Sequence, residues 1–300
     1  MPDIAFVGLG RMGTPMCAAL VRAGYTVTAT DKRAEREPAA IACGASWQDT
    51  PARAASSAGV LITMLPGARE VRAAMLGQDG ALTSLAAGAA WIDMTSNAPA
   101  AARPVQDQAM KQSVEVLEAP AGGAIAAARE GTLQLFVSGE ASAVEKHRAV
   151  LEALGDPRRI VHVGGHGAGY TVKLLVNLLW FGQAVATAEA LLLGQRAGID
   201  PAVLRHVLAG SPAASSLIRS DIGLAFRGDY LDSFGLDGIC EELEAVTALA
   251  GEYQVPWQLS DIVRRTYRRA LDRFGPADGE LLAVSLLEHE AGDKLRTAPS

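Results

Sequence analysis

The feature that most constrains the fold of this 300-residue chain is the segment Gly8-Leu9-Gly10-Arg11-Met12-Gly13, which follows a short apolar run. A GxGxxG pattern between a strand and a helix predicts a tight turn at the first glycine. It predicts a bare backbone at the second glycine and close strand–helix packing at the third. The amides at the start of the helix then face outwards, where they bind a pyrophosphate. The sequence therefore predicts a dinucleotide-binding domain in which these loop residues contact the cofactor: Gly8, Leu9, Gly10, Arg11, Met12 and Gly13.

An acidic residue directly follows the next predicted strand, which spans residues 25–30. Asp31 lies at the distance from the glycines where a carboxylate accepts hydrogen bonds from the adenosine ribose. A negative charge there disfavours a 2′-phosphate, so Asp31 predicts NAD as the cofactor. Lys32 and Arg33 follow directly and are able to bind that phosphate, so the sequence leaves NADP open.

Short β-rich runs alternate with helix-like stretches through the first half of the chain, at residues 4–8, 25–30, 60–65, 90–94, 114–118, 133–137 and 160–163. This alternation predicts βαβ units and a mostly parallel sheet covered by helices on both faces. After residues 164–167 the pattern becomes helical, with breaks at 198–201, 210–212 and 274–276. We therefore predict an α/β fold: a Rossmann-type doubly wound parallel sheet over residues 1–163, an all-α domain over 164–293 and a polar, frayed tail at 294–300.

Charge and cysteine content narrow the range of partners. The formal net charge of −6 provides no positive field for nucleic acid or anionic lipid. The three cysteines have neither CxxC spacing nor histidines at metal-ligand intervals, so we expect reduced thiols, no metal site and a cytoplasmic protein. The N-terminus lacks a basic region and a cleavage site, so we expect no secretion.

The segment 174–194 is apolar enough to suggest a membrane span. Asn177, Gln183 and Glu189 interrupt it. A helix that is apolar on nearly all sides is then better interpreted as buried inside the protein or in a subunit interface. We therefore expect no membrane partner.

The residues best suited to proton transfer lie just after the predicted domain boundary. Lys173 and Asn177 are four residues apart, and hence on one face of a helix in an otherwise apolar stretch. Burial lowers the pKa of a lysine towards neutrality, where general-base chemistry operates. Oxidation of an alcohol by hydride transfer needs such a group for the hydroxyl proton. Although Lys-x-x-x-Asn pairs also occur on helix surfaces, this one follows a dinucleotide fold and predicts the catalytic residues of a dehydrogenase.

Segments in one order along nearly the whole chain resemble the β-hydroxyacid dehydrogenase family, which includes 3-hydroxyisobutyrate dehydrogenase and tartronate semialdehyde reductase. The resemblance rests on FVGLGRMGTPMCAALVRAGYTV at 6–27, MLP at 64–66, DMTSNAP at 93–99, EAPAGGAIAAAREGTL at 118–133 and the segment with Lys173 and Asn177. The resemblance implies NAD(P)-dependent interconversion of a small β-hydroxy compound and its aldehyde or keto form, with Lys173 as general acid/base and Asn177 beside it.

The same resemblance implies further site residues and an assembly. Leu65, Pro66 and Ser96 are expected to line the cofactor near its ribose and nicotinamide. Backbone amides around Gly122 and Gly123 are expected to bind a substrate carboxylate, as amides that converge on an anion do. The resemblance also implies a homodimer or homotetramer in which a long central helix is buried.

Two positions depart from the family pattern. Family members usually read Ser-Gly-Gly where this chain reads Gly122-Gly123-Ala124, so a hydroxyl donor is missing. They commonly carry a lysine in a Lys-Asp-Leu motif where this chain has Glu241-Glu242-Leu243. Both changes weaken recognition of a small carboxylate. We therefore predict Glu241 at the substrate and a substrate with an amine, a polyol or no carboxylate; the alternative is that Glu241 faces solvent.

Two other functions stay open on sequence grounds. One is a non-catalytic nicotinamide-binding module, which the intact Lys173/Asn177 pair disfavours. The other is an imine reductase on the related fold. Proteins of that kind usually lack the lysine, whereas the acidic Glu241 suits a cationic substrate.

Overall fold

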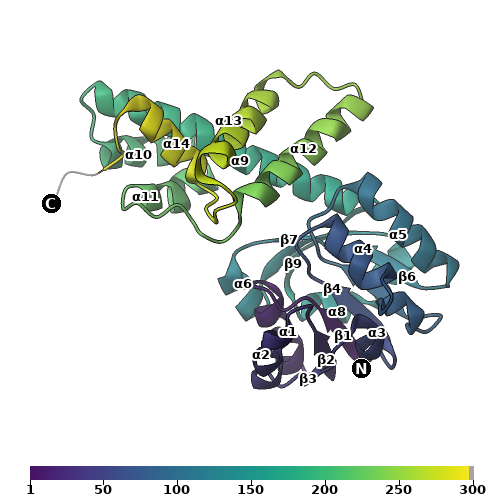
Figure 1. The fold of residues 1–300 in the computed structure, drawn as a ribbon. Helices are drawn as coiled ribbons and strands as arrows, with labels where there is room; N and C mark the ends of the chain where they lie inside the picture. Colours follow the sequence, from purple (N-terminus) through teal and green to yellow (C-terminus); the bar gives the residue numbers. More distant parts are fainter. Residues whose placement is uncertain (297–300) are drawn as a thin grey trace. The chain divides into compact units, whose positions relative to one another are not determined.

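The computed structural model describes residues 1–296 and divides into two compact units, one of residues 1–174 and one from residue 175 onwards. The division falls inside a long helix, α9 (Ala168–Arg196), which is continuous from one unit into the next (Figure 1). The boundary predicted near residue 164 lies shortly before this helix begins. Each unit has its own architecture.

The first unit is built on a sheet that has nine strands within the described residues, in the order β3-β2-β1-β4-β5-β6-β8-β7, with β9 paired to β8. The strands from β3 to β6 in this order are parallel, and β8 runs antiparallel to β6. The strands are β1 (Ile4–Val7), β2 (Val27–Thr30), β3 (Ser46–Trp47), β4 (Val60–Thr63), β5 (Ala90–Asp93), β6 (Glu115–Glu118), β7 (Ala121–Gly122), β8 (Leu133–Ser138) and β9 (Gly155–Gly164). This is the strand order of a doubly wound dinucleotide-binding fold, so the predicted fold class is confirmed.

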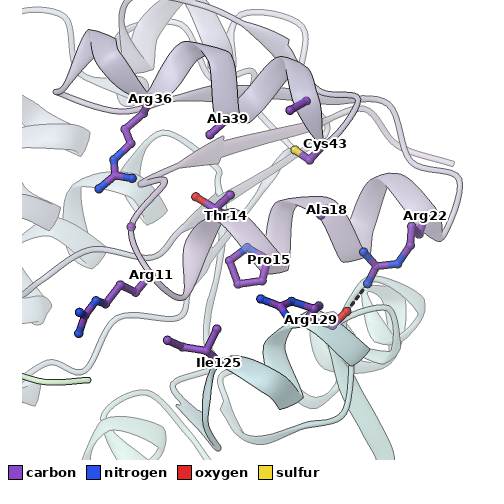
Figure 2. A pocket seen from close by; sticks show the side chains of 12 residues that line it. Arg11, Thr14, Pro15, Ala18, Arg22, Arg36, Ala39, Cys43, Ile125 and Arg129 are labelled. Carbon is purple, nitrogen blue, oxygen red and sulfur yellow. Dashed lines mark hydrogen bonds between the residues drawn. The ribbon is translucent and has the colours of Figure 1, made fainter. Parts of the chain in front are cut away.

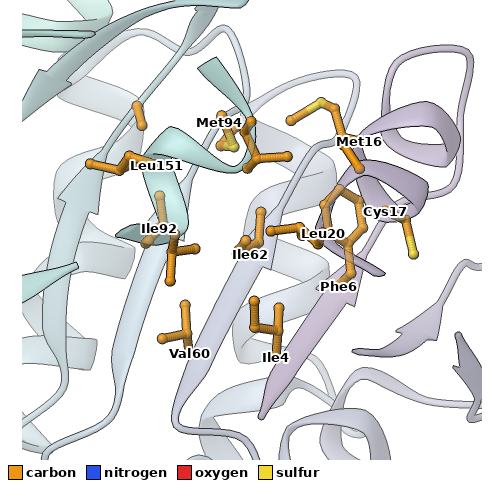
Figure 3. Close-up of a cluster of buried hydrophobic side chains, with 14 of the residues drawn as sticks. Ile4, Phe6, Met16, Cys17, Leu20, Val60, Ile62, Ile92, Met94 and Leu151 are labelled. Carbon is orange, nitrogen blue, oxygen red and sulfur yellow. The ribbon is translucent and has the colours of Figure 1, made fainter. Parts of the chain in front are cut away.

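Alternation along the strands divides the core into two layers. Ile4 and Phe6 of β1 pack with one cluster of buried side chains, whereas Ala5 and Val7 pack with another on the opposite face. Figure 3 shows the first cluster, where side chains of β1, β4 and β5 meet residues of α1. The helices of this unit are α1 (Gly13–Arg22), α2 (Glu37–Ala42), α3 (Pro51–Ala55), α4 (Ala68–Leu76), α5 (Pro99–Lys111), α6 (Ile125–Glu130), α7 (Ala141–Lys146) and α8 (Arg148–Glu152). Strands buried on both faces explain why the sequence shows short, almost continuous apolar runs.

The second unit is helical, as predicted. Its helices after α9 are α10 (Pro201–Ala209), α11 (Ile222–Ala225), α12 (Leu236–Glu252), α13 (Gln258–Phe274) and α14 (Leu282–Ala291). The predicted breaks coincide with real ends: Asp200 caps α10 by accepting hydrogen bonds from two backbone amides, and α13 ends at Phe274 before a glycine. Capping residues and prolines thus explain why the helical pattern of the sequence is interrupted at these positions.

Helix α9 is long and apolar enough to cross a membrane by length and composition alone, and 44% of its most apolar window is buried. Leu179 is 64% exposed and Leu193 is 73% exposed. The protein core therefore covers one side of α9 and leaves apolar side chains on another side uncovered.

The C-terminal segment differs from the predicted frayed tail at Lys294–Arg296. Leu295 is fully buried, and its N–H donates to the carboxylate of Glu288 at 2.9 Å. Lys294 Nζ lies 3.0 Å from the same buried carboxylate. A buried carboxylate needs such partners, and the polar composition of the segment supplies them. The expectation of fraying was wrong here, and residues 297–300 lie outside the described part of the chain.

Candidate dinucleotide and proton-transfer site

The glycine loop connects β1 to α1, and two of its glycines are required by the fold itself. Gly8 has a φ of +106°, and a Cβ there would lie 2.2 Å from the carbonyl oxygen of Met64. A Cβ on Gly13 would lie 1.9 Å from the carbonyl oxygen of Gly8. Strand, loop and helix therefore pack too closely for any side chain at either position, as the sequence predicted.

Gly10 is different, because a Cβ added there meets nothing within 4 Å. The protein itself does not need a glycine at this position. A bare backbone beside open space, at the start of a helix, fits the approach of a pyrophosphate to backbone amides. The loop thus fits the dinucleotide that the sequence predicted, with Arg11 exposed and Met12 half-buried beside it.

Asp31 follows β2 and organises the loop. Its Oδ2 accepts the N–H of Leu9 at 2.7 Å, and its Oδ1 accepts both the backbone N–H and the Nε of Arg33 at 3.0 Å. Burial by itself raises the pKa of Asp31, but the hydrogen bonds from Arg33 and Leu9 outweigh it and hold that pKa below its usual value. The carboxylate is therefore ionised and is paired with a cation, while Lys32 is exposed beside it.

A groove of about 670 Å³ lies beside the loop, between α1, α2 and α6 (Figure 2). Four arginines line it, Arg11, Arg22, Arg36 and Arg129, and no acidic residue lies among its described lining. The Nε of Arg36 is buried and has no hydrogen-bond partner in the described structure. The described lining of this groove therefore carries an excess of positive charge.

The next predicted cofactor residues follow the ends of β4 and β5. Leu65 is half-buried and its N–H donates to Thr95 Oγ1 at 3.1 Å, Pro66 is exposed, and Ser96 is half-buried. The carboxyl ends of parallel strands form one edge of a sheet, so these residues share the edge with the glycine loop. Sequence reasoning missed Asn97, which is 4% exposed and whose Nδ2 has no hydrogen-bond partner in the described structure.

Gly122 and Gly123 lie at the end of the short strand β7. Gly122 is buried, and Gly123 is exposed with a φ of +124°. The positive φ favours a glycine at Gly123. The binding of a substrate carboxylate by amides of this segment stays a prediction.

Two buried carboxylates that the sequence reasoning also missed lie at the ends of neighbouring strands. Asp93, at the end of β5, accepts the hydroxyl of Tyr170 at 2.7 Å. Glu118, at the end of β6, accepts the N–H of Gly167 at 2.6 Å. Both residues belong to the motifs DMTSNAP and EAPAGG, which are recognisable in the sequence. The sequence did not reveal their partners, Tyr170 and Gly167, because these lie far away along the chain.

Lys173 lies on α9, one helical turn after Tyr170, and is half-buried. Asn177 lies one turn further along the same helix, and its Nδ2 donates to Glu242 Oε2 at 2.6 Å. Glu241, the residue predicted at the substrate, is exposed on α12. The acidic residue that pairs with Asn177 is therefore the neighbour of the one that the motif alignment selected.

Comparison with known proteins agrees with this arrangement. A family model described as the NAD binding domain of 6-phosphogluconate dehydrogenase matches residues 3–165, and one described as NAD-binding of NADP-dependent 3-hydroxyisobutyrate dehydrogenase matches residues 167–287. A 3-hydroxyisobutyrate dehydrogenase of Pseudomonas aeruginosa is 40% identical over 208 residues, which are 69% of either chain. A 2-(hydroxymethyl)glutarate dehydrogenase of Eubacterium barkeri is 30% identical over 265 residues, 88% of this chain and 87% of that protein.

Among solved structures, a 3-hydroxyisobutyrate dehydrogenase of Mycobacterium tuberculosis with L-serine superposes with a TM-score of 0.85. The sequence identity is 26%, and the match covers 96% of this chain and 99% of that one. Fold and sequence thus point to the same group of proteins.

The contrast between Gly10 and Gly13 gives a test of the loop. We expect Gly10→Ala to fold normally but to bind NADH at least about tenfold more weakly, a loss of about 1.4 kcal/mol, because its methyl group occupies the approach of the pyrophosphate. We expect Gly13→Ala to lower the free energy of unfolding by roughly 1–3 kcal/mol or more, because its methyl group meets the Gly8 carbonyl. Fluorescence titration and urea unfolding measure the two effects. Normal NADH binding by Gly10→Ala would show that the loop is not the pyrophosphate site.

Proposed function

Because this chain belongs to the β-hydroxyacid dehydrogenase family of NAD(P)-dependent oxidoreductases acting on CH–OH groups, we propose that Lys173 carries the proton in that reaction. The observation that supports the proposal is the setting of Lys173. It is half-buried on α9, and the first turn of that helix is bonded to the ends of β5 and β6. Those strand ends belong to the same sheet edge as the glycine loop.

The proposed chemistry of the chain is general acid–base catalysis. A nicotinamide cofactor bound at this edge supplies or accepts the hydride. In alcohol oxidation, neutral Lys173 takes the hydroxyl proton as the carbon is oxidised; in carbonyl reduction, protonated Lys173 donates a proton to the carbonyl oxygen. Asn177, one turn away on α9, orients the lysine or the substrate oxygen.

We assign the cofactor to the glycine loop and to the residues that follow the next strands. Backbone amides of Gly10, Arg11 and Met12 bind the pyrophosphate, and Asp31 and Lys32 face the adenosine ribose. Leu65, Pro66 and Ser96 line the remainder. NAD is the proposed preference, but because Arg33 pairs with Asp31, the discrimination against NADP is modest.

The proposed substrate is a small β-hydroxy compound that carries an amine. Gly122 and Gly123 present backbone amides, and the acidic pair Glu241-Glu242 replaces a lysine of the family motif. Asn177 follows Lys173 by one turn of α9, and its Nδ2 donates to Glu242 Oε2. An anion near the reacting group favours a cationic substrate over a plain carboxylate. An imine reductase is the second candidate function, because the acidic Glu241 also suits a cationic imine substrate.

We further propose residues 1–163 and 164–293 as the functional domains of a cytoplasmic homodimer or homotetramer. The exposed apolar residues of α9, such as Leu179 and Leu193, support a second copy of the chain as their cover. Sedimentation of the purified protein tests this assembly.

The central test is removal of the lysine. We expect Lys173→Ala to lower kcat by about 10²–10⁴-fold with little change in the Kd for NADH, as loss of a proton-transfer group does. The assay follows NADH absorbance with 3-hydroxyisobutyrate, L-serine and 2-(hydroxymethyl)glutarate as alcohols, and with a cyclic imine as the substrate of the alternative imine reduction. Lys146→Ala, on the surface beside Glu115, is the matched control. Turnover retained by Lys173→Ala rules out its role, and NADH binding without any turnover by the wild type favours a non-catalytic module.

Cofactor selection is tested by changing either member of the Asp31–Arg33 pair. Asp31→Asn removes the negative charge and leaves Arg33 available to a phosphate, so we expect the preference for NADH over NADPH to fall by about tenfold. Arg33→Met leaves Asp31 without its cation. We therefore expect this variant to raise the preference for NADH over NADPH. Titration of both variants with the two cofactors gives the ratio of Kd values. The ribose assignment fails if neither ratio moves.

The acidic pair is tested by two isosteric variants on one helix. Glu242→Gln keeps an acceptor for Asn177 but removes the charge, so we expect kcat/KM for L-serine relative to 3-hydroxyisobutyrate to fall by about tenfold. Glu241→Gln removes an exposed charge and is expected to change the ratio less. A larger effect at Glu241 would return the specificity role to that residue, and no effect at either would exclude an amine-bearing substrate.

A further inference from the structure

We propose that Tyr170, Asp93, Glu118 and Ser138 are positioning residues that fix the first turn of α9, and through it Lys173, against the carboxyl ends of β5, β6 and β8. The inference rests on the proposed role of Lys173. All four side chains are fully buried, so none of them is available to touch a substrate.

We call the hydrogen bonds that these four residues make to the start of α9 the anchor. Its first part is a cap made by the ends of two strands. Glu118 and Ser138 end β6 and β8 and are paired with each other in the sheet. Glu118 Oε1 accepts the N–H of Gly167 at 2.6 Å, and Ser138 Oγ accepts the N–H of Gly169 at 3.0 Å while donating to Glu118 Oε2. Amides at a helix start have no partner within the helix, and a carboxylate there also interacts favourably with the helix dipole.

The cap requires α9 to approach β8 very closely. A Cβ on Gly169 would lie 2.7 Å from the carbonyl oxygen of Phe136 and 2.8 Å from Ser138 Oγ. A glycine at this position is therefore what allows the amide to reach the serine. Gln106 of α5 donates to the same oxygen, Glu118 Oε1, at 2.8 Å and so helps to fix the carboxylate.

The second part of the anchor is the hydrogen bond from Tyr170 to Asp93. The hydroxyl lies 2.7 Å from Asp93 Oδ2, while Asp93 Oδ1 accepts Thr63 Oγ1 at 2.8 Å and the N–H of Thr95 at 3.1 Å. Burial, and then the charges of Asp93 and Glu118, raise the pKa of Tyr170 well above its usual value. The tyrosine therefore stays a hydrogen-bond donor over the whole working pH range.

The three contacts act on Gly167, directly before α9, and on Gly169 and Tyr170 in the first turn of the helix. Bonds at residues 167, 169 and 170 leave that turn unable to slide along its axis or to rotate about it. Lys173 is three residues after Tyr170 and lies on the neighbouring part of the same helix face. The position of its Cα is thus set by the ends of the strands, which also carry the cofactor loops.

The residue types of the anchor indicate that it positions the start of α9 rather than adding to the stability of the fold. Two fully buried carboxylates, Asp93 and Glu118, bind Tyr170 and Gly167, which lie three and six residues before the proposed proton carrier. Buried charges contribute little net stability compared with well-packed apolar side chains, but a fully satisfied polar network specifies one arrangement. Placement to within a fraction of an ångström is what proton transfer needs.

The test compares two Tyr→Phe variants, each of which removes one buried hydroxyl group. Tyr170→Phe removes the donor to Asp93; Tyr267→Phe removes a fully buried hydroxyl that donates to the carbonyl oxygen of Glu280 at 2.9 Å, in the second unit. We expect both variants to lose similar stability. Only Tyr170→Phe is expected to lower kcat, by about tenfold or more, with KM and the Kd for NADH unchanged. Rates are normalised to NADH-binding sites and measured with 3-hydroxyisobutyrate or L-serine, whichever the wild type oxidises faster.

Two further readouts separate positioning from destabilisation. Hydrogen–deuterium exchange of the peptide that spans residues 167–174 needs no substrate, and we expect Tyr170→Phe and Ser138→Ala to raise its exchange while Tyr267→Phe does not. In a Lys173→Ala background, Tyr170→Phe is expected to change the residual kcat by less than twofold, because the tyrosine acts only through the lysine.

The possible outcomes distinguish this inference from the proposed function. Wild-type kcat or unchanged exchange in Tyr170→Phe, with Lys173→Ala inactive, overturns the positioning role and leaves Lys173 as the proton carrier. Independent, multiplicative losses in the double variant overturn it in the same way. Full activity of Lys173→Ala overturns both proposals together.

Discussion

The candidate site depends on one repeated arrangement: a carboxylate at the carboxyl end of a parallel strand holds backbone amides of a neighbouring loop or helix. Asp31, after β2, accepts the amide of Leu9 and so fixes the glycine loop. Asp93, at the end of β5, accepts the amide of Thr95, and Glu118, at the end of β6, accepts the amide of Gly167. The glycine loop, the turn after β5 and the helix that carries Lys173 are therefore fixed by the same kind of bond from an amide to a carboxylate.

These carboxylates have opposite effects on stability. For Asp31, bonds from Arg33 and Leu9 outweigh burial and lower the pKa, so its contribution is present above the ordinary pKa of an aspartate and is lost as the pH falls through the lowered value. Burial raises the pKa of Asp93, so its contribution is present at low pH and is lost as the pH rises through the raised value. At neutral pH an ionised Asp93 thus costs stability. This cost fits the positioning role proposed for the bond from Tyr170 to Asp93.

Local patterns predicted what depends on neighbours in the chain. The loop from Gly8 to Gly13, the main strands and the helix ends follow from glycine, alternation and capping rules that act over a few residues. The two-residue strands β3 and β7 were missed because they are too short to alternate. The packing of Leu295 was missed because its partner, Glu288, is polar by composition and buried only in the folded chain. The bond between Tyr170 and Asp93 joins positions 77 residues apart, which no local rule detects.

The residues proposed for substrate choice and for proton transfer take their partners from different parts of the chain. Every anchor of the first turn of α9 comes from strands of the first unit, whereas Asn177 takes its partner, Glu242, from α12 in the second unit. Successive residues of a helix point about 100° apart, so a motif alignment alone does not decide which of two adjacent acids faces Asn177. A substitution on α12 therefore changes the charge next to Asn177 without disturbing the bonds that hold Lys173.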